Sequence, residues 1–292
     1  MKKLSLNHKA IIKGLKFYNI NDSFYLEKCL DCCNYLQKNK QAKINFETVY
    51  NLLYNNLQSS YRPLLKKKSK EELFGENYHS FTTNLILLLG YAIHKKNIKN
   101  KKIDKVLANN LISRVKQSLT NDIYNRNLDE IRVSQMLWGA YLINIKIIEI
   151  GRLQYEHYKD SKDEYIKIHI PPGDKMTYNA LLQSLKQSKE YVKKYFKIDC
   201  CDYYCNSWLL SKQISTLLDE NANINQFQSL FEIKEGPNCI KDILNYVYQK
   251  NEIDDYKNLD ELTSLQKSVK RYLLNGNAIN IGIGKLKKEH LK

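Results

Sequence analysis

The hydrophobic periodicity of the chain changes at about residue 150, and this change constrains the fold more than any other feature. From Asn21 to about Ile148, apolar residues recur every three or four positions, as in "FETVYNLLYNNL", "KVLANNLISRVKQSLTNDIY" and "VSQMLWGAYLINIKIIEI". Such spacing is typical of amphipathic helices. After Gly151, apolar and polar residues alternate, which is typical of half-buried strands. The sequence therefore predicts an all-α domain over residues 1–148 and a mixed α/β sheet domain over residues 149–292.

The second half contains a readable order of strands and helices. In "EYIKIHI" the three isoleucines point to one side, and "GRLQYEHYK" alternates as well. The polar "DSKD" between them predicts an antiparallel hairpin. Further strands are predicted at "DYYCNSWLL", "FEIKE", "NYVYQ" and "NAINIGIGKL", and a helix at "LTSLQKSVKRYLLNG". This order predicts a mixed sheet with helices packed on it.

The stretch "IHIPPGDKMTYNALLQSLKQSKEYV" joins a strand to a helix through a turn that suits an anion. The strand must end at Pro171–Gly173, because proline donates no ladder hydrogen bond and glycine adopts backbone angles that other residues resist. Asp174 or Thr177 can cap the helix that follows. Amide donors at the start of this helix, with Lys175 beside them, are suited to a phosphate and especially to a pyrophosphate.

Several classes of function lack their sequence signature. Neither a P-loop nor the dinucleotide motif GxGxxG is present, which argues against nucleotide hydrolysis and a Rossmann cofactor. Cys29, Cys32 and Cys33 have helical spacing without a second ligand pair, so no metal site is expected. The seven cysteines are odd in number and follow no signal-peptide pattern, which predicts a cytoplasmic protein. The longest apolar run, "LILLLGYAI", is far shorter than the ~20 residues of a membrane span.

The formal net charge of +16 is concentrated in the first half of the chain. Residues 1–150 hold 25 Lys/Arg against 12 Asp/Glu. Such a surface attracts polyanions, including nucleic acid, acyl carrier proteins and coenzyme phosphates. Because no nucleic-acid reader motif and no interleaved aromatic residues accompany the charge, we do not favour nucleic-acid binding.

A series of motifs in the second half resembles a known family. The succession "GRLQYE", "IHIPPG", "CNSWLL", "NINQFQSLFEI" and "TSLQKSVKRYLLNGNAINIGIG" is similar to bacterial acyltransferase-domain proteins with a helical N-terminal domain and a GNAT-like C-terminal domain. The motif order covers residues 150–286. The N-terminal half is similar only in length and helicity.

The resemblance implies where a donor would bind. In GNAT enzymes a central strand splays from its neighbour, the pantetheine of acyl-CoA pairs with its edge, and the pyrophosphate lies on the following loop and helix. The strand would be Tyr165–Ile170, the loop Pro171–Thr177, the helix Tyr178–Phe196 and the neighbouring strand Tyr203–Leu210. The implied cofactor-binding residues are Ile168, Ile170, Gly173, Asp174, Lys175, Met176 and Thr177. The implied donor is acyl-CoA or acetyl-CoA. Because the superfamily loop pattern (Q/R)xxGx(G/A) is absent and Pro171 and Pro172 remove two amides that such a loop would use, an acyl carrier protein is the alternative donor.

The chemistry requires a base for the attacking amine and donors for the developing oxyanion. Glu156 and His169 are the candidate bases, since they lie on adjacent predicted strands near the splay. Ser207 is the candidate that protonates the departing thiolate or hydrogen bonds the thioester. The predicted lining of the acyl or acceptor pocket is Tyr204, Cys205 and Trp208, with covalent acylation of Cys205 the less favoured alternative.

The leading hypothesis is therefore a GNAT-like acyltransferase that transfers an acyl group to an amine-bearing small molecule or peptide, without a metal. The first alternative is a catalytically silent GNAT-fold binding module. A basic nucleic-acid-binding protein is the less favoured second alternative.

Overall fold

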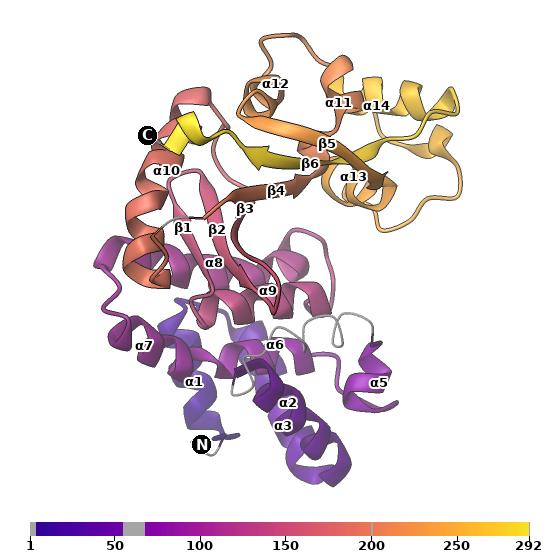
Figure 1. The fold of residues 1–292 in the computed structure, drawn as a ribbon. Coiled ribbons are helices and arrows are strands. Elements are labelled where there is room, and N and C mark those ends of the chain that lie inside the picture. Colours follow the sequence, from indigo (N-terminus) through magenta and orange to yellow (C-terminus); the bar gives the residue numbers. More distant parts are fainter. Residues whose placement is uncertain (1–3, 55–67, 200, 292) are drawn as a thin grey trace. The chain divides into compact units, whose positions relative to one another are not determined.

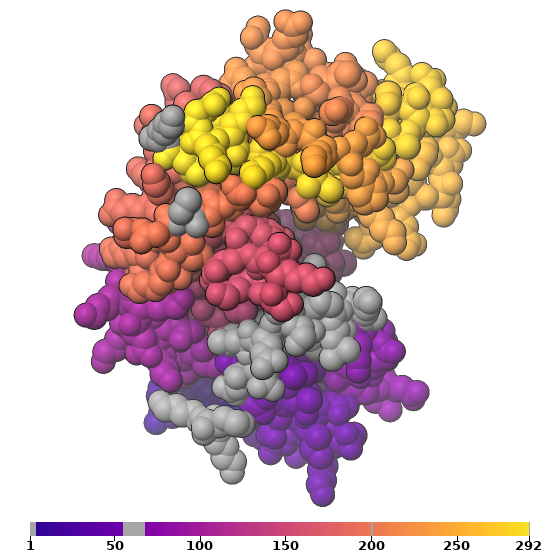
Figure 2. All heavy atoms as spheres, viewed as in Figure 1, coloured from indigo at the N-terminus to yellow at the C-terminus, as the bar shows by residue number. Residues whose placement is uncertain are grey.

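The computed structural model describes residues 4–54, 68–199 and 201–291, and the chain forms two compact units, Met1–Ile148 and Glu149–Lys292. Figure 1 shows the fold, and Figure 2 shows all heavy atoms in the same view. The predicted architecture is confirmed, because a helical region is followed by a mixed sheet with helices. The division between the units falls within the first strand.

Unit 1 is built around one buried helix. All eight residues of α6 (Thr82–Leu89) are buried, and helices α1, α2, α3, α8 and α9 contact it. Side-chain caps such as Asp104 on Leu107 N fix where several of these helices begin. No helix among the described residues is long and apolar enough to cross a bilayer. The other helices described in unit 1 are α1 (His8–Phe17), α2 (Ser23–Lys38), α3 (Lys40–Tyr54), α5 (Lys70–Phe74), α7 (Tyr91–Asn100), α8 (Lys105–Tyr124) and α9 (Val133–Ile143).

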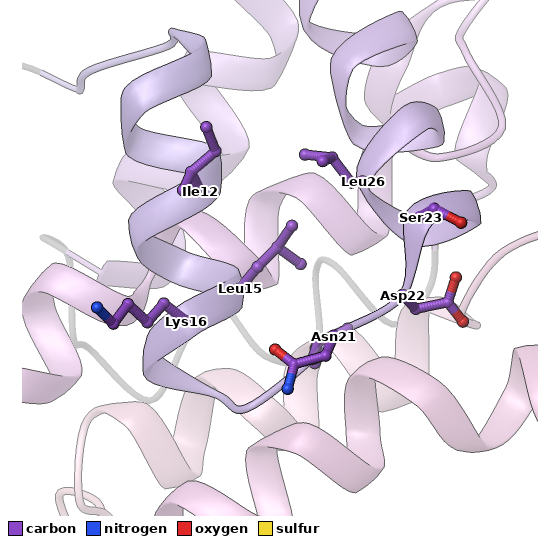
Figure 3. A pocket seen from close by; sticks show the side chains of 8 residues that line it. Ile12, Leu15, Lys16, Asn21, Asp22, Ser23 and Leu26 are labelled. Atoms are coloured by element: carbon purple, nitrogen blue, oxygen red, sulfur yellow. The ribbon is translucent and has the colours of Figure 1, made fainter.

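A pocket of about 430 Å³ lies where α1 meets α2. Figure 3 shows Leu15 and Leu26 directed into the space between the two helices. Asp22 caps α2 by accepting a hydrogen bond from Tyr25 N at 3.2 Å. The remaining lining residues are Ile12, Lys16, Ile20, Asn21 and Ser23. The pocket is mainly apolar and gathers no set of groups suited to acyl transfer.

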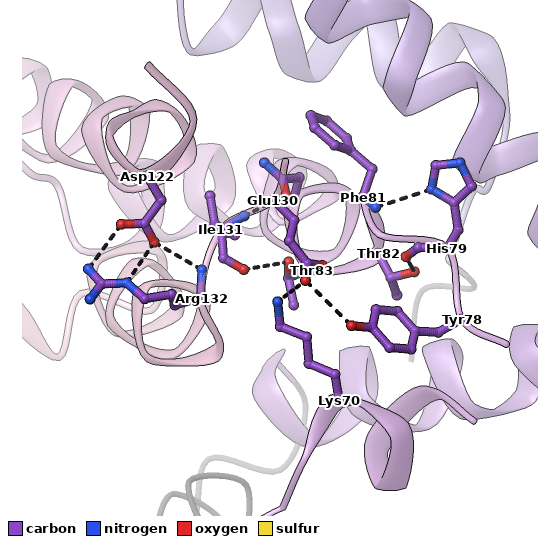
Figure 4. Close-up of polar contacts among 11 residues, drawn as sticks. Lys70, Tyr78, His79, Phe81, Thr82, Thr83, Asp122, Glu130, Ile131 and Arg132 are labelled. Atoms are coloured by element: carbon purple, nitrogen blue, oxygen red, sulfur yellow. Dashed lines mark hydrogen bonds and ion pairs between the residues drawn. The ribbon is translucent and has the colours of Figure 1, made fainter. Parts of the chain in front are cut away.

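Buried polar groups hold the segment between α8 and α9 against α6. Asp122 is 1% exposed and accepts two hydrogen bonds from Arg132, from the backbone N–H at 2.9 Å and from Nε at 3.0 Å. Thr83 donates to the carbonyl of Ile131 at 2.9 Å, and Asn84 accepts from the N–H of Ile131 at 3.0 Å. Figure 4 shows most of these contacts. These hydrogen bonds join α6, α8 and the segment that leads into α9.

His94 on α7 is fully buried in unit 1. Its Nδ1 lies 3.3 Å from the hydroxyl of Tyr18, and its Nε2 has no hydrogen-bond partner within the described part of the chain. Burial lowers the pKa of His94 to about 3, because a charged imidazole would lose its hydration. The folded protein therefore holds this ring neutral over most of the acid range.

The neutral His94 should make folding sensitive to acid. An unfolded histidine binds a proton near pH 6.5 and the folded one only near pH 3, so the free energy of unfolding falls as pH falls between these values. Between pH 6.5 and 4.5 we expect His94→Leu to remove about 2 kcal/mol of this loss, measured by urea unfolding at both pH values. The exposed His8 supplies the control His8→Gln, which should keep the wild-type slope. Equal pH slopes in His94→Leu and wild type would contradict the assignment.

Unit 2 contains a mixed sheet with the strand order β1-β2-β3-β4-β6-β5 in its described residues. Neighbours β3 and β4 are parallel, whereas β2 with β3, β4 with β6, and β5 with β6 are antiparallel. The strands are β1 (Ile147–Ile150), β2 (Leu153–Lys159), β3 (Glu164–His169), β4 (Tyr203–Ser207), β5 (Phe231–Asn238) and β6 (Asn280–Leu286). The longer helices are α10 (Tyr178–Tyr191), extended by a π turn (Val192–Phe196), α13 (Ile240–Val247) and α14 (Ser264–Leu274), and the short ones are α11 (Lys212–Thr216) and α12 (Asn223–Gln228).

The predicted hairpin is confirmed, since β2 and β3 pair in antiparallel register from Gln154↔His169 to Lys159↔Glu164. Its exposed tip, residues 159–164, forms part of the visible surface in Figure 2. On one face of the hairpin, Tyr155 lies under α10, and its hydroxyl is 2.8 Å from that of Ser184. Ile166 and Ile168 of β3 are buried on the same face. The opposite face carries Glu156, Lys167 and His169.

Two local predictions were wrong. The predicted strand "NYVYQ" belongs to α13 and the residues after it, because Ile243, Leu244 and Tyr248 have helical spacing and are buried in one cluster. The segment "IIEI", predicted as the end of a helix, forms β1 after a turn in which Ile145 has a positive φ of 50°.

Candidate functional site

The parallel strands β3 and β4 pair over a short stretch, in the middle of β3 and at the start of β4. Their register consists of Ile166↔Tyr203 and Lys167↔Tyr204, whereas β3 continues to His169 and β4 to Ser207. Over the same stretches β3 stays paired with β2, and β4 stays paired with β6. Two neighbours in the middle of the sheet therefore separate toward their C-terminal ends, as the resemblance implied for a pantetheine site.

The separation leaves main-chain groups of both strands directed at the gap. Ile166 N donates to the carbonyl of Asp202 at 3.0 Å, so its main chain faces β4. Because main-chain direction alternates along a strand, the polar groups of Ile168 point the same way, and Ile170 lies one residue beyond the end of β3. On β4 the main chain of Asn206 points back toward β3. An extended ligand with amide groups can add to such an edge as a further strand does.

The turn after β3 leads directly into α10. Gly173 has a φ of 155°, in a region that side chains disfavour. Of the two predicted caps, Thr177 occupies the N-cap position, and its hydroxyl accepts from Ala180 N at 3.4 Å. Asp174 and Lys175 are exposed, and Met176 is buried. The amides of Tyr178 and Asn179 in the first turn of α10 therefore follow directly on the turn from the end of β3.

Arg152 holds this turn from the start of β2 and was not predicted as a site residue. Its Nε donates to the carbonyl of Asp174 at 2.8 Å, and its Nη1 donates to that of Pro171 at 2.6 Å. The hairpin register explains its position, because continuing Gln154↔His169 by two residues places Arg152 opposite Pro171. The sequence could have indicated this contact through the register of the β2–β3 hairpin, and using that register required the pairing of the two strands to be known.

The two candidate bases form one hydrogen-bonded pair. His169 Nε2 lies 2.8 Å from Glu156 Oε2, with side chains 27% and 4% exposed. The carboxylate is therefore buried, and the imidazole is the member that a ligand can reach. The neighbouring His157 lies on the opposite face of the hairpin, where its Nε2 is 2.9 Å from Glu164.

The other predicted side chains separate into two groups. Tyr204 shares the face of His169, and its ring meets Tyr165 edge-on at 5.1 Å. Cys205 and Ser207 lie on the opposite, α10-facing side by strand alternation. Burial raises the pKa of the Cys205 thiol to about 12, which disfavours a nucleophilic thiolate. Ser207 accepts a hydrogen bond from Leu209 N at 3.1 Å, so its oxygen caps the turn after β4.

Trp208 begins that turn, a short 3₁₀ helix (Trp208–Leu210) that contacts β6. The indole packs against an apolar cluster formed largely by α11, α13 and α14. Close approach to β6 requires Gly282, because a Cβ there would lie 2.0 Å from the carbonyl oxygen of Leu210. Gly282 was also missed, since the sequence gives no sign of which backbone would approach it. No group of three or more His, Cys, Asp or Glu residues in the described segments is arranged to hold a metal.

Comparison with known proteins shows what this domain is similar to. Residues 147–286 match the model of the family described as GNAT-like C-terminal domain. The chain is similar to the crystal structure of an acyltransferase in complex with decanoyl-CoA, with a TM-score of 0.77 and 16% identity over 97% of this chain and 89% of that chain. It is also similar to an acyltransferase mutant in complex with octanoyl-CoA, with a TM-score of 0.80 and 15% identity over 98% and 89% of the two chains.

A third similar structure is an acyltransferase in complex with CoA and 10C-teicoplanin, with a TM-score of 0.77 and 14% identity over 95% of this chain and 87% of that chain. A comparison with curated protein sequences found no match. At these identities the similarity shows a shared fold. The predicted resemblance and the GNAT-like fold are thereby confirmed.

Proposed function

We propose, from the match of residues 147–286 to the model of the GNAT-like C-terminal domain, that the protein is an acyltransferase that moves an acyl group from acyl-CoA to an amine. The observation that carries the proposal is the separation of β3 from β4 beside the turn that opens α10. The acyl-CoA complexes of similar structures support this class of donor.

The donor would lie along the gap between β3 and β4. Amides of the pantetheine would hydrogen bond to the edge of β3 at Ile168 and Ile170. The pyrophosphate would lie on the turn from Gly173 to Thr177, where the first-turn amides of α10 and the cation of Lys175 favour negative charge. This arrangement brings the thioester toward the point where the strands join, near Lys167 and Tyr204.

His169 would act as the general base and Glu156 would orient it. A carboxylate that accepts from Nε2–H leaves the lone pair on Nδ1 and stabilises the imidazolium that forms on proton uptake. The amine nitrogen attacks the thioester carbonyl while its proton passes to the imidazole. Collapse of the tetrahedral intermediate breaks the carbon–sulfur bond and releases coenzyme A. Proton transfer to the departing thiolate by Ser207 stays a prediction.

The acceptor would approach the face of the sheet that carries His169 and Tyr204. Structures similar to this chain contain teicoplanin or 10C-teicoplanin, which supports an amine-bearing small molecule or peptide as the acceptor. An acyl carrier protein as an alternative donor and a cytoplasmic location stay predictions.

Calorimetry with acetyl-CoA, octanoyl-CoA and decanoyl-CoA tests the proposal. We expect saturable binding of at least one acyl-CoA at one site per chain, and release of free thiol when an amine acceptor is added. Absence of binding to all three donors would contradict it. Binding without thiol release, if insensitive to substitution of His169, would favour the silent binding module.

A further inference from the structure

The turn between β3 and α10 lacks the means to fix its own conformation. Pro171 and Pro172 have no N–H to donate, and Gly173 adopts a φ that only glycine favours. Within the turn, the backbone makes one hydrogen bond that the structure describes, from Thr177 N to the carbonyl of Lys175 at 3.0 Å. A segment of this composition samples many conformations in the absence of outside contacts.

Arg152 supplies contacts at both ends of this segment. Its planar guanidinium donates to Pro171 O at 2.6 Å and to Asp174 O at 2.8 Å. A fork of fixed donors can hold two acceptors at a set separation, which a lysine ammonium on a flexible stem cannot. Gly151, with a φ of 56°, starts the turn into β2 that presents Arg152. A Cβ on Gly151 would lie 3.4 Å from Ser184 of α10, so this turn also lies beside the helix.

The contact has a consequence for anion binding. Carbonyl oxygens repel phosphate, and two carbonyls of the segment are turned toward the guanidinium. The amides of the turn other than that of Thr177, and those of Tyr178 and Asn179 in the first turn of α10, then remain for an anion, with an additional positive charge close by. We propose that Arg152 is a positioning and specificity-determining residue, which holds this turn in its diphosphate-binding form and so selects donors that carry a diphosphate over pantetheine donors without one. The inference rests on the proposed function.

Binding of CoA and of pantetheine to wild type, Arg152→Met and Arg152→Lys tests this assignment. By calorimetry on the full chain, we expect both substitutions to weaken CoA binding at least tenfold and to leave pantetheine binding within twofold. Hydrogen exchange of residues 173–177 should speed up in both variants. The matched control is Arg271→Met, since Arg271 is exposed on α14, and it should bind like wild type. Thermal unfolding of each variant checks that it is folded.

The outcomes separate the two proposals. If wild type binds neither acyl-CoA nor CoA, the proposed function fails. If wild type binds CoA and Arg152→Met binds it equally well, only the role of Arg152 is overturned. Wild-type affinity in Arg152→Lys would mean that charge alone suffices, which overturns the positioning role. An equal loss for CoA and pantetheine would also overturn the selectivity for a diphosphate.

Discussion

Replacing His169 by alanine is expected to lower kcat/KM for acyl transfer by roughly 10²–10⁴-fold, the usual contribution of a positioned general base. The donor Kd should change little, because the proposed donor contacts use the main chain of β3 and the turn. Glu156→Gln should give a smaller loss than His169→Ala, since the amide can still accept from Nε2–H but no longer stabilises the imidazolium. Steady-state kinetics with calorimetry of the donor measures both effects.

The same hairpin offers a matched control. His157 and Glu164 form a second histidine–carboxylate pair at 2.9 Å, on the same two strands but on the opposite face. His157→Ala and Glu164→Gln should therefore keep kcat/KM within about threefold. Equal losses of kcat/KM in the two pairs would indicate a structural effect. Full activity of His169→Ala would contradict the assignment of His169 as the general base.

Gly282→Ala is expected to destabilise unit 2 by about 3 kcal/mol or more, or to prevent its folding. The added Cβ would lie 2.0 Å from the oxygen and 2.4 Å from the carbon of the Leu210 carbonyl. Backbone atoms cannot rotate away as a side chain can, so the turn after β4 must move. Chemical denaturation with fluorescence detection measures the change.

Two further variants define the cause of that loss. Gly276→Ala places a Cβ in open space at a φ of 77°, so it should cost only the backbone strain of about 1–2 kcal/mol. Leu210→Ala in the Gly282→Ala background should not restore stability, because it leaves the carbonyl in place. Restoration by this second substitution would show that the overlap lies with the side chain.

The sequence predicted the parts of the fold that depend on local pattern. The alternation in "EYIKIHI" indicated which residues of β3 are buried. The helical pattern of the first half was equally clear. Two local errors arose where competing signals overlap: "NYVYQ" is rich in strand-forming residues but belongs to an amphipathic helix, and "IIEI" continues an apolar run past the end of α9.

The candidate site was only partly accessible from the sequence. Glu156 and His169 were named because adjacent strands bring them close, and the structure shows them hydrogen bonded. Arg152 and Gly282 were missed because their roles depend on a carbonyl contributed by another segment. The direction of a backbone carbonyl cannot be predicted from hydrophobic periodicity or from composition. The faces of Cys205 and Ser207 likewise depend on the register of β4 with β3.

The most direct test of the central claim is hydrogen exchange of the full chain with and without octanoyl-CoA. If the donor lies in the gap between β3 and β4, the ligand should slow exchange in peptides that cover residues 168–180 and 204–208. Unchanged exchange in both segments, with protection elsewhere such as the pocket between α1 and α2, would contradict the account.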